Sequence, residues 1–177
     1  VLLAVARGDG SPFYEALAGL GIPLVSHTGW ERTLPTANDR VADPALLRPA
    51  LERGVTVIMA HCGTKSFYGE SCHVDSFMRM ARAWEHCYGD TSALNLPTRS
   101  YGWRRLLEDD VVRDKLVHGS DWPILPLPPL RRVGLGGALA LLREKNWMKR
   151  DALVKQRLGL EGEYWTRAAR LLRMNTA

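Results

Sequence analysis

Three titratable side chains stand where short apolar runs of the sequence give way to loops. His27 and His61 each end an apolar run and are followed two positions later by glycine, while Asp121 follows an apolar lead-in and a small-residue turn. Pro123 pushes Trp122 away from helical geometry and ends regular strand pairing, so Asp121 is expected at the tip of a strand. Enzymes built of alternating strands and helices keep their chemistry at such strand ends.

The spacing of these side chains fits a repeated strand-helix-strand unit. His61 lies 34 residues after His27, and Asp121 lies 60 residues after His61, which matches one and two repeats of about 30 residues each. A strand in the skipped position is expected near Asp90. Because consecutive strands joined through a helix are parallel, the four strand ends would meet at one rim. The expected strands are 22–27, 55–60, 88–92 and 116–121.

Histidines and aspartates at strand ends also have plainer roles. A histidine there is often a hydrogen-bonded core residue, and Asp90 is expected to be either a rim group or an ordinary turn carboxylate. His118 lies three residues before Asp121 inside one expected strand, where alternation places the two side chains on opposite faces. We therefore rank His118 below His27 and Asp121 as a functional candidate.

The segments between the expected strands carry helical signals. Ser11 can cap a helix with Pro12 in its first turn, and Pro49 should delay or kink the helix that opens at Asp43. The expected helices are 11–20, 43–54, 73–86, 101–108, 133–145, 149–158 and 162–173.

Two polar loops follow the first two expected strands. The first carries Trp30 and Arg32, and the second carries Lys65 and Tyr68. Long loops inside compact domains tend to be functional. We interpret these four side chains as substrate contacts, and the two cations among them indicate an anionic substrate.

Length and composition are typical of a soluble globular protein and predict a single domain over 1–177. Of the 177 residues, 46% are hydrophobic and 24% are charged, which is ordinary for such a domain. No apolar run approaches the roughly 18 residues of a membrane span, and the first six residues are too few for the core of a secretory signal. These observations predict a cytoplasmic protein that does not bind a membrane.

The cysteines and the charges indicate no separate function. Cys62, Cys72 and Cys87 cannot all pair within one chain, and their spacing differs from that of structural zinc sites. We expect Cys62 and Cys87 to be buried as small apolar residues. The formal net charge is +5, and residues 125–177 carry 11 Lys or Arg against 4 Asp or Glu.

The basic residues of this C-terminal region form no pattern that reads nucleic acid, so they are expected on a solvated helical face. They include Arg143, Lys145, Lys149, Arg150, Lys155, Arg157, Arg167, Arg170 and Arg173.

The ordered strand ends carry a family resemblance. The motifs His-Thr-Gly, Ala-His-Cys-Gly, Gly-Asp-Thr-Ser and Gly-Ser-Asp-Trp-Pro resemble the C-terminal half of the metal-dependent amidohydrolase superfamily. The most similar branch is the amidohydrolase-related one, also called amidohydrolase 2, which includes decarboxylases of the aminocarboxymuconate-semialdehyde type. The resemblance covers about residues 11–173, because Trp-Thr-Arg-Ala-Ala-Arg-Leu-Leu is similar to the last helix of that family.

The resemblance implies an α/β fold, a (β/α)8 barrel of which this chain supplies about strands 5 to 8, and a divalent metal, most often Zn²⁺. It implies that His27 is a metal ligand and that His61 orients or deprotonates the metal-activated water. Asp121 corresponds to the aspartate that touches the metal and shuttles a proton. Neutral imidazole and carboxylate bind zinc at about 2 Å, and the ion lowers the pKa of its water to roughly 7.

One element of the family pattern is missing. Full members begin with a strand bearing His-any-His, and this sequence has no such triplet. Eight repeats would need the roughly 250 residues typical of this barrel. We therefore expect a partial barrel whose partner is the missing N-terminal half or a second copy. Val25, Val57 and Met59, or their strand neighbours on the inward face, would then meet water.

The resulting functional prediction is a metal-dependent hydrolase, or in related members a decarboxylase, that acts on a small anionic substrate and is active in the complete barrel. The alternative is a non-catalytic half-barrel that serves as an assembly or binding module. The same barrel cleaves amides and lactones or removes carboxylates when its loops change, so the bond is not readable from the fold.

Overall fold

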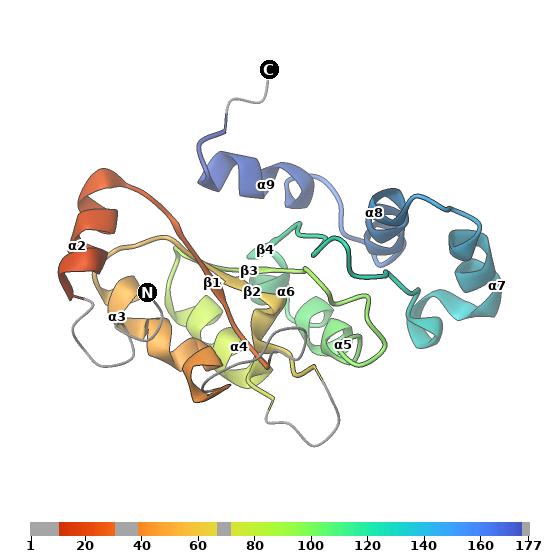
Figure 1. Cartoon of the computed structure of the whole chain (residues 1–177), viewed down its shortest axis with the longest axis horizontal. Helices are drawn as coiled ribbons and strands as arrows, with labels where there is room; N and C mark the ends of the chain where they lie inside the picture. The colour runs from red at the N-terminus through yellow and green to blue at the C-terminus, as the bar shows by residue number, and fades with distance from the viewer. Residues whose placement is uncertain (1–10, 31–38, 67–71, 175–177) are drawn as a thin grey trace.

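Four short parallel strands form the centre of the structure (Figure 1). The computed structural model describes residues 11–30, 39–66 and 72–174. The strands are β1 (Leu24–His27), β2 (Val57–Ala60), β3 (Cys87–Asp90) and β4 (Leu116–Val117), side by side in the order β1-β2-β3-β4. All three pairings are parallel. The predicted set of parallel strands in chain order is therefore confirmed.

The strand ends differ from their predicted positions for local reasons. β1 begins at Leu24 because Pro23 has no N–H to give to a neighbouring strand. β2 begins later than predicted because the N–H of Val55 donates to Ala50 O at 3.1 Å, in the preceding helix. β4 ends before a turn in which Asp121 has a left-handed φ of 60°. The predicted strands 22–27, 55–60 and 116–121 were thus too long.

Helices occupy the segments between and around the strands. They are α2 (Ser11–Leu20), α3 (Arg48–Glu52), α4 (Val74–Ala83), α5 (Gly102–Leu107), α6 (Asp110–Arg113), α7 (Leu130–Leu142), α8 (Trp147–Arg157) and α9 (Tyr164–Leu171), with 3-10 turns at Asp39–Ala42, Pro44–Leu47 and His61–Gly63. Pro49 lies in the first turn of α3, and a 3-10 turn precedes that helix, which confirms the predicted delay. Helix α6 was not predicted. Asp109 caps it by accepting the N–H of Val112 at 3.0 Å.

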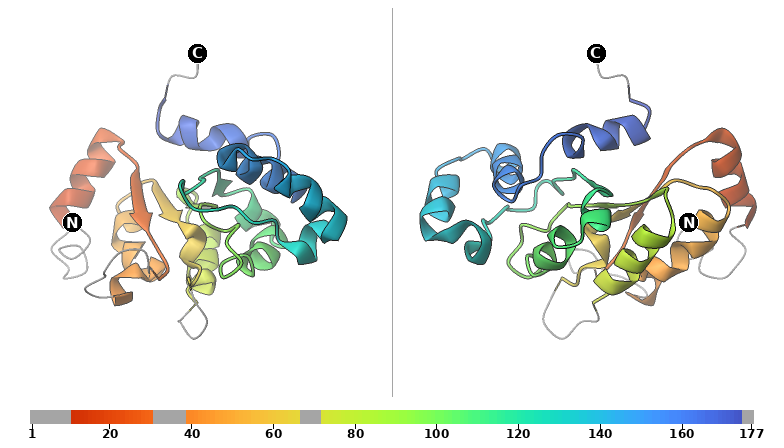
Figure 2. Two further views of the ribbon diagram at one scale, coloured as in Figure 1. Left: turned by 45° about the vertical axis from the view of Figure 1, so that its right-hand side comes forward. Right: turned by 180° about the vertical axis from the view of Figure 1, so that it is seen from behind.

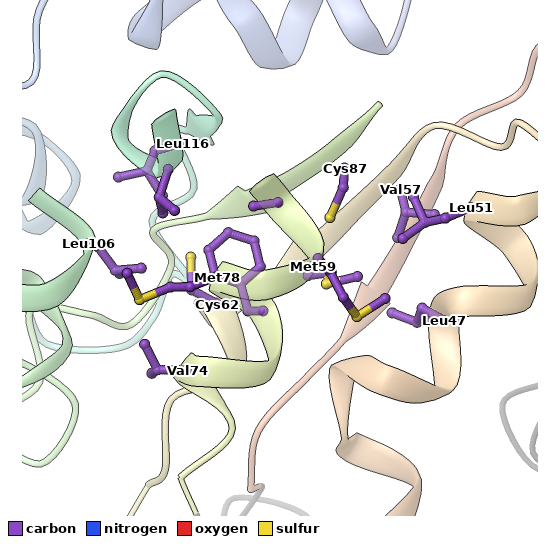
Figure 3. Close-up of a cluster of buried hydrophobic side chains, with 14 of the residues drawn as sticks. Leu47, Leu51, Val57, Met59, Cys62, Val74, Met78, Cys87, Leu106 and Leu116 are labelled. Atoms are coloured by element: carbon purple, nitrogen blue, oxygen red, sulfur yellow. The ribbon is translucent and has the colours of Figure 1, made fainter. Parts of the chain in front are cut away.

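One face of the sheet is covered by helices and holds the hydrophobic core (Figure 3). Val57 and Met59 point to this face, are 0% exposed, and belong to the same cluster as Phe77 of α4 and Leu51 of α3. The expected exposure in β2 is therefore wrong both for Val57 and Met59 and for their strand neighbour Ile58, which is 3% exposed. Val25 alternates to the other face and is 54% exposed, as predicted for an inward side chain.

The last three helices lie apart from the first ones. Helices α7 and α8 lie together at the end of the molecule away from α2 and α3, while α9 runs past β4 (Figures 1 and 2). Arg167 in α9 donates from Nη1 to Leu116 O at 2.5 Å, and the hydroxyls of Tyr164 and Thr91 are hydrogen-bonded at 2.6 Å. These contacts fix α9 to the edge of β4. No helix within the described ranges is long and apolar enough to cross a membrane.

Gly89 in β3 tests the packing of α4 on the sheet. A Cβ at this position would lie 2.3 Å from a Phe77 ring carbon and 2.6 Å from Cys62 Sγ. Gly89→Ala should therefore lower the free energy of unfolding by about 1–3 kcal/mol through overpacking, measured by urea denaturation. The control is Gly19→Ala, which meets nothing within 4 Å in the helix α2 and should leave stability unchanged or raised. Equal stability of the two variants would contradict the packing described.

His118 makes the docking of α9 sensitive to acid. Its ring lies 4.9 Å from that of Trp165 and 6.0 Å from that of Tyr164. Burial, with the nearby Lys155 ammonium, lowers the pKa of His118 from its ordinary 6.5 to about 4.

Between those two values the unfolded chain binds a proton that the folded chain does not, so the free energy of unfolding should fall as the pH drops from about 6.5 towards 4. His118→Phe keeps an aromatic ring and should make the urea midpoint less dependent on pH across this interval. An unchanged pH dependence in the variant would contradict this assignment.

Candidate functional site

The two predicted rim histidines meet at the ends of neighbouring strands. His27 is the last residue of β1 and pairs in register with Ala60, and His61 follows directly after β2. Their ring centroids are 4.9 Å apart, and the rings meet edge to face at 70°. His27 Nε2 donates to Gly29 O at 3.1 Å, because a carbonyl oxygen can only accept. The structure thus brings together two of the three side chains that the sequence predicted.

A left-handed turn holds His61 at this position. His61, Cys62 and Gly63 have φ values of 61°, 51° and 68°, a region that residues with a Cβ rarely adopt. Thr28 ties the turn to β1, because its hydroxyl donates to Ala60 O at 2.5 Å and accepts the N–H of Gly63 at 3.0 Å. The ends of β1 and β2 are therefore linked through one side chain that the sequence analysis did not single out.

Arg99 is a second supporting residue that the sequence analysis missed. Arg99 is 3% exposed, and its guanidinium contacts the loops after both β1 and β2. Nη1 donates to Thr64 O at 2.6 Å and to Thr64 Oγ1 at 3.0 Å, and Nη2 donates to Trp30 O at 2.8 Å and to Ser66 Oγ at 2.6 Å. An arginine presents its donors in a rigid planar fork, which suits this bridging of two loops.

The predicted substrate contacts are only partly described. Trp30 is half-buried and Lys65 stands after the left-handed turn, whereas Arg32 and Tyr68 lie outside the described residues. The N–H of Lys65 donates to the hydroxyl of Tyr101 at 2.8 Å, and its ammonium lies 5.4 Å from the centre of the Tyr101 ring. Burial raises the pKa of Tyr101, so this hydroxyl stays protonated at neutral pH.

Asp121 does not lie beside His27 and His61. It is exposed in the turn after β4, with a φ of 60°. A buried lysine in α8 supports this turn: Lys155 is 0% exposed and donates to Gly119 O at 2.6 Å and to Asp151 at 2.5 Å. Burial lowers the pKa of Lys155 and raises that of Asp151.

Part of the basic C-terminal region is therefore structural. The prediction of a solvated face was wrong for Arg150, Lys155 and Arg167, which are 8%, 0% and 8% exposed. Each is held by polar partners: Arg150 donates to Glu144 O at 2.8 Å, for example. Sequence alone gives these positions the same signal as their exposed neighbours, because helical spacing does not tell which side meets solvent when the neighbouring element is unknown.

The cysteines behave as predicted. Cys62 and Cys87 are 0% exposed. Burial raises the pKa of Cys62 well above its ordinary value and that of Cys87 to about 12. Both thiols therefore stay protonated and act as small apolar side chains, and Cys62 Sγ also donates to Asp90 O at 3.1 Å.

The metal prediction can be tested against these positions. Within the described ranges, no three His, Cys, Asp or Glu side chains come close enough together to hold a metal ion. The imidazole of His27 and the carboxylate of Asp121 fit a metal in donor chemistry. Asp121 lies apart from His27, so the described residues by themselves supply an incomplete ligand set.

Arg99 allows a direct test of the loop bridge. Arg99→Met should lower the free energy of unfolding by about 3 kcal/mol, because several buried acceptors lose a charged donor. The free energy of unfolding of Arg99→Lys should lie between those of the parent and of Arg99→Met. An ammonium keeps the charge but cannot donate to both loops as a planar guanidinium does. Urea denaturation measures the difference. The control is Arg113→Met, because within the described residues Arg113 forms an ion pair only with the exposed Asp110, three positions before it. Parent-like stability of Arg99→Met would contradict the bridge.

Comparison with known proteins supplies the family. A family model described as amidohydrolase matches residues 3–149, a span that includes all four strands, the histidine pair and the Asp121 turn. No curated protein and no solved structure matches the chain. The parallel four-stranded α/β sheet is consistent with part of a (β/α)8 barrel of this family. By its sequence match and by the order of its strand ends, the chain belongs to the amidohydrolase family.

Proposed function

We propose that the chain is the C-terminal part, about strands 5 to 8, of a metal-dependent hydrolase that acts on a small anionic substrate. The observation that carries the proposal is the imidazole pair His27 and His61 at the ends of adjacent parallel strands, with ring centroids 4.9 Å apart. The pair lies in a chain of the amidohydrolase family. Carboxyl ends of parallel strands are where barrel enzymes hold their reacting groups. Decarboxylation of a small acid is the alternative reaction at the same site.

The roles of the residues follow from their chemistry. His27 and Asp121 would hold the divalent ion, most suitably Zn²⁺, with further ligands from the rest of the barrel. When bound, such an ion supplies a water molecule that is easily deprotonated and polarises the bond to be cleaved. His61 would orient the attacking water or accept its proton, and the carboxylate of Asp121 would pass a proton on to the leaving group.

The chain also contributes to substrate binding in this proposal. Lys65 and Trp30 lie in loops that Arg99 joins at their bases, so the two loops are held together at the rim. The ammonium of Lys65 would attract an anionic substrate, and Arg32 would add a second cation. Arg99 itself is 3% exposed, so its guanidinium would hold the loops together without contacting the substrate directly.

A non-catalytic assembly module is the second candidate, and one observation favours it. Val25 is 54% exposed in β1, on the sheet face opposite to the buried Val57 and Met59. Burying such a side chain is worth roughly 1.5–3 kcal/mol. We propose that the missing N-terminal half of the barrel, or a second copy of the chain, covers this face.

The catalytic proposal predicts that activity depends on metal and on the rim. The protein, with the remainder of its barrel supplied, should hydrolyse members of a panel of small anionic amides, esters and lactones. Chelation should abolish turnover, and Zn²⁺ should restore it. His61→Asn and Asp121→Asn should each lower kcat by at least about 100-fold, as loss of a general base does, with unchanged circular dichroism.

The matched control is Asp114→Asn, an exposed carboxylate outside the rim. Turnover of Asp121→Asn near the parent rate would remove Asp121 from the catalytic residues. Absence of any metal-dependent turnover across the panel, together with self-association through β1, would instead favour the assembly module.

A further inference from the structure

A buried polar cluster surrounds the inner side of the His61 ring. Ser92, at the end of β3, is 6% exposed, and His61 is 5% exposed. His61 Nδ1 lies 3.0 Å from Ser92 O and 2.8 Å from Ser92 Oγ. The Ser92 hydroxyl in turn donates to Asp90 Oδ1. Three residues from two strand ends thus form one continuous hydrogen-bonded chain.

The chemistry of these partners decides where the proton of the imidazole lies. The carbonyl oxygen of Ser92 can only accept, so Nδ1 must carry the hydrogen in that contact. The carboxylate oxygen of Asp90 can only accept as well, so the Ser92 hydroxyl gives its hydrogen to Asp90 and offers a lone pair to Nδ1. Both contacts therefore require Nδ1–H. A neutral imidazole then has its lone pair on Nε2.

The same carboxylate oxygen also stabilises the strained backbone beneath the ring. Asp90 Oδ1 accepts the N–H of His61 at 3.0 Å and the N–H of Ser92 at 2.9 Å, in addition to the Ser92 hydroxyl. His61 and Cys62 both have left-handed φ values, a conformation that persists only when the surroundings hold it. One oxygen atom therefore fixes both the turn that presents His61 and the hydroxyl that faces its ring.

We propose that Asp90 and Ser92 are positioning residues that hold His61 in the Nδ1–H tautomer and present the lone pair of Nε2 to the rim beside His27. This inference rests on the proposed function, in which His61 acts on water. A base that accepts a proton from water needs a lone pair directed at the reaction site. Within the described residues, His61 Nε2 has no hydrogen-bond partner.

The cluster also reaches the turn that carries Asp121. A Cβ at Gly119 would lie 3.1 Å from Ser92 Cβ and 3.2 Å from Asp90 Cγ. The backbone of this turn therefore packs directly on the two positioning residues. Asp90 and Ser92 set the orientation of His61 on one side and the approach of the Asp121 turn on the other.

Nitrogen-15 NMR of the chain labelled at histidine, recorded without metal at a pH where His61 is neutral, tests the proposal directly. The parent should show His61 Nδ1 as the protonated, pyrrole-type nitrogen and Nε2 as the pyridine-type nitrogen. Ser92→Ala should lower the ratio of Nδ1–H to Nε2–H tautomers roughly five- to tenfold, as expected for one lost hydrogen bond. Asp90→Asn should shift the ratio in the same direction.

Two further variants separate positioning from general stability. Ser92→Thr keeps the hydroxyl and should restore the parent ratio. Ser100→Ala removes a hydroxyl from the same loop, and it should leave the ratio unchanged. Among the described residues this hydroxyl bonds only to Pro97 O.

Two results would overturn the proposal: a parent in which Nε2 carries the proton, or a Ser92→Ala variant with the parent ratio and a dispersed, folded spectrum. If Asp90→Asn does not fold, the tautomer ratios of Ser92→Ala and Ser92→Thr still test the proposal. These readings need no substrate or metal, so failure of the hydrolase proposal leaves them intact and is recognised separately by the absence of turnover.

Discussion

The turn His61–Gly63 at the end of β2 is the constraint on which the rim depends. His61 and Cys62 follow β2 directly and both have left-handed φ values. These values are unfavourable for residues with a Cβ. Asp90 and Thr28 supply the hydrogen bonds that offset the strain.

Buried charged groups support the rim from behind. Arg99 joins the loops after β1 and β2, and Lys155 supports the turn after β4. A buried cation is tolerated only when its donors are satisfied, so each of these side chains fixes the backbone carbonyls around it. The loops after β1 and β2 are consequently joined at Trp30 and Thr64 by hydrogen bonds from one side chain. Such preorganisation suits a site that must hold reacting groups at fixed distances.

The chain belongs to the amidohydrolase family, yet its site residues are not all brought together. This follows from the positions of His27, His61 and Asp121. Two imidazoles stand together, whereas Asp121 is exposed at the far edge of a four-stranded sheet. In an open sheet the first and last strands are separated by the two between them. Only closure into a barrel would bring the ends of β1 and β4 round a common centre. The exposed face at Val25 fits the same geometry.

The sequence by itself determined the order of parallel strands, the helices between them and the polar residues at each strand end, because these follow from local periodicity, proline and glycine. It did not determine which face Val57 and Met59 occupy, since a buried parallel strand is apolar on both sides. Tertiary structure alone decided the partners of Asp90, Arg99 and Lys155. Their contacts lie 29, 35 and 36 residues away along the chain. Whether a charged side chain is solvated or buried depends on strand register and on the element packed against it, and neither is encoded within a local stretch of residues.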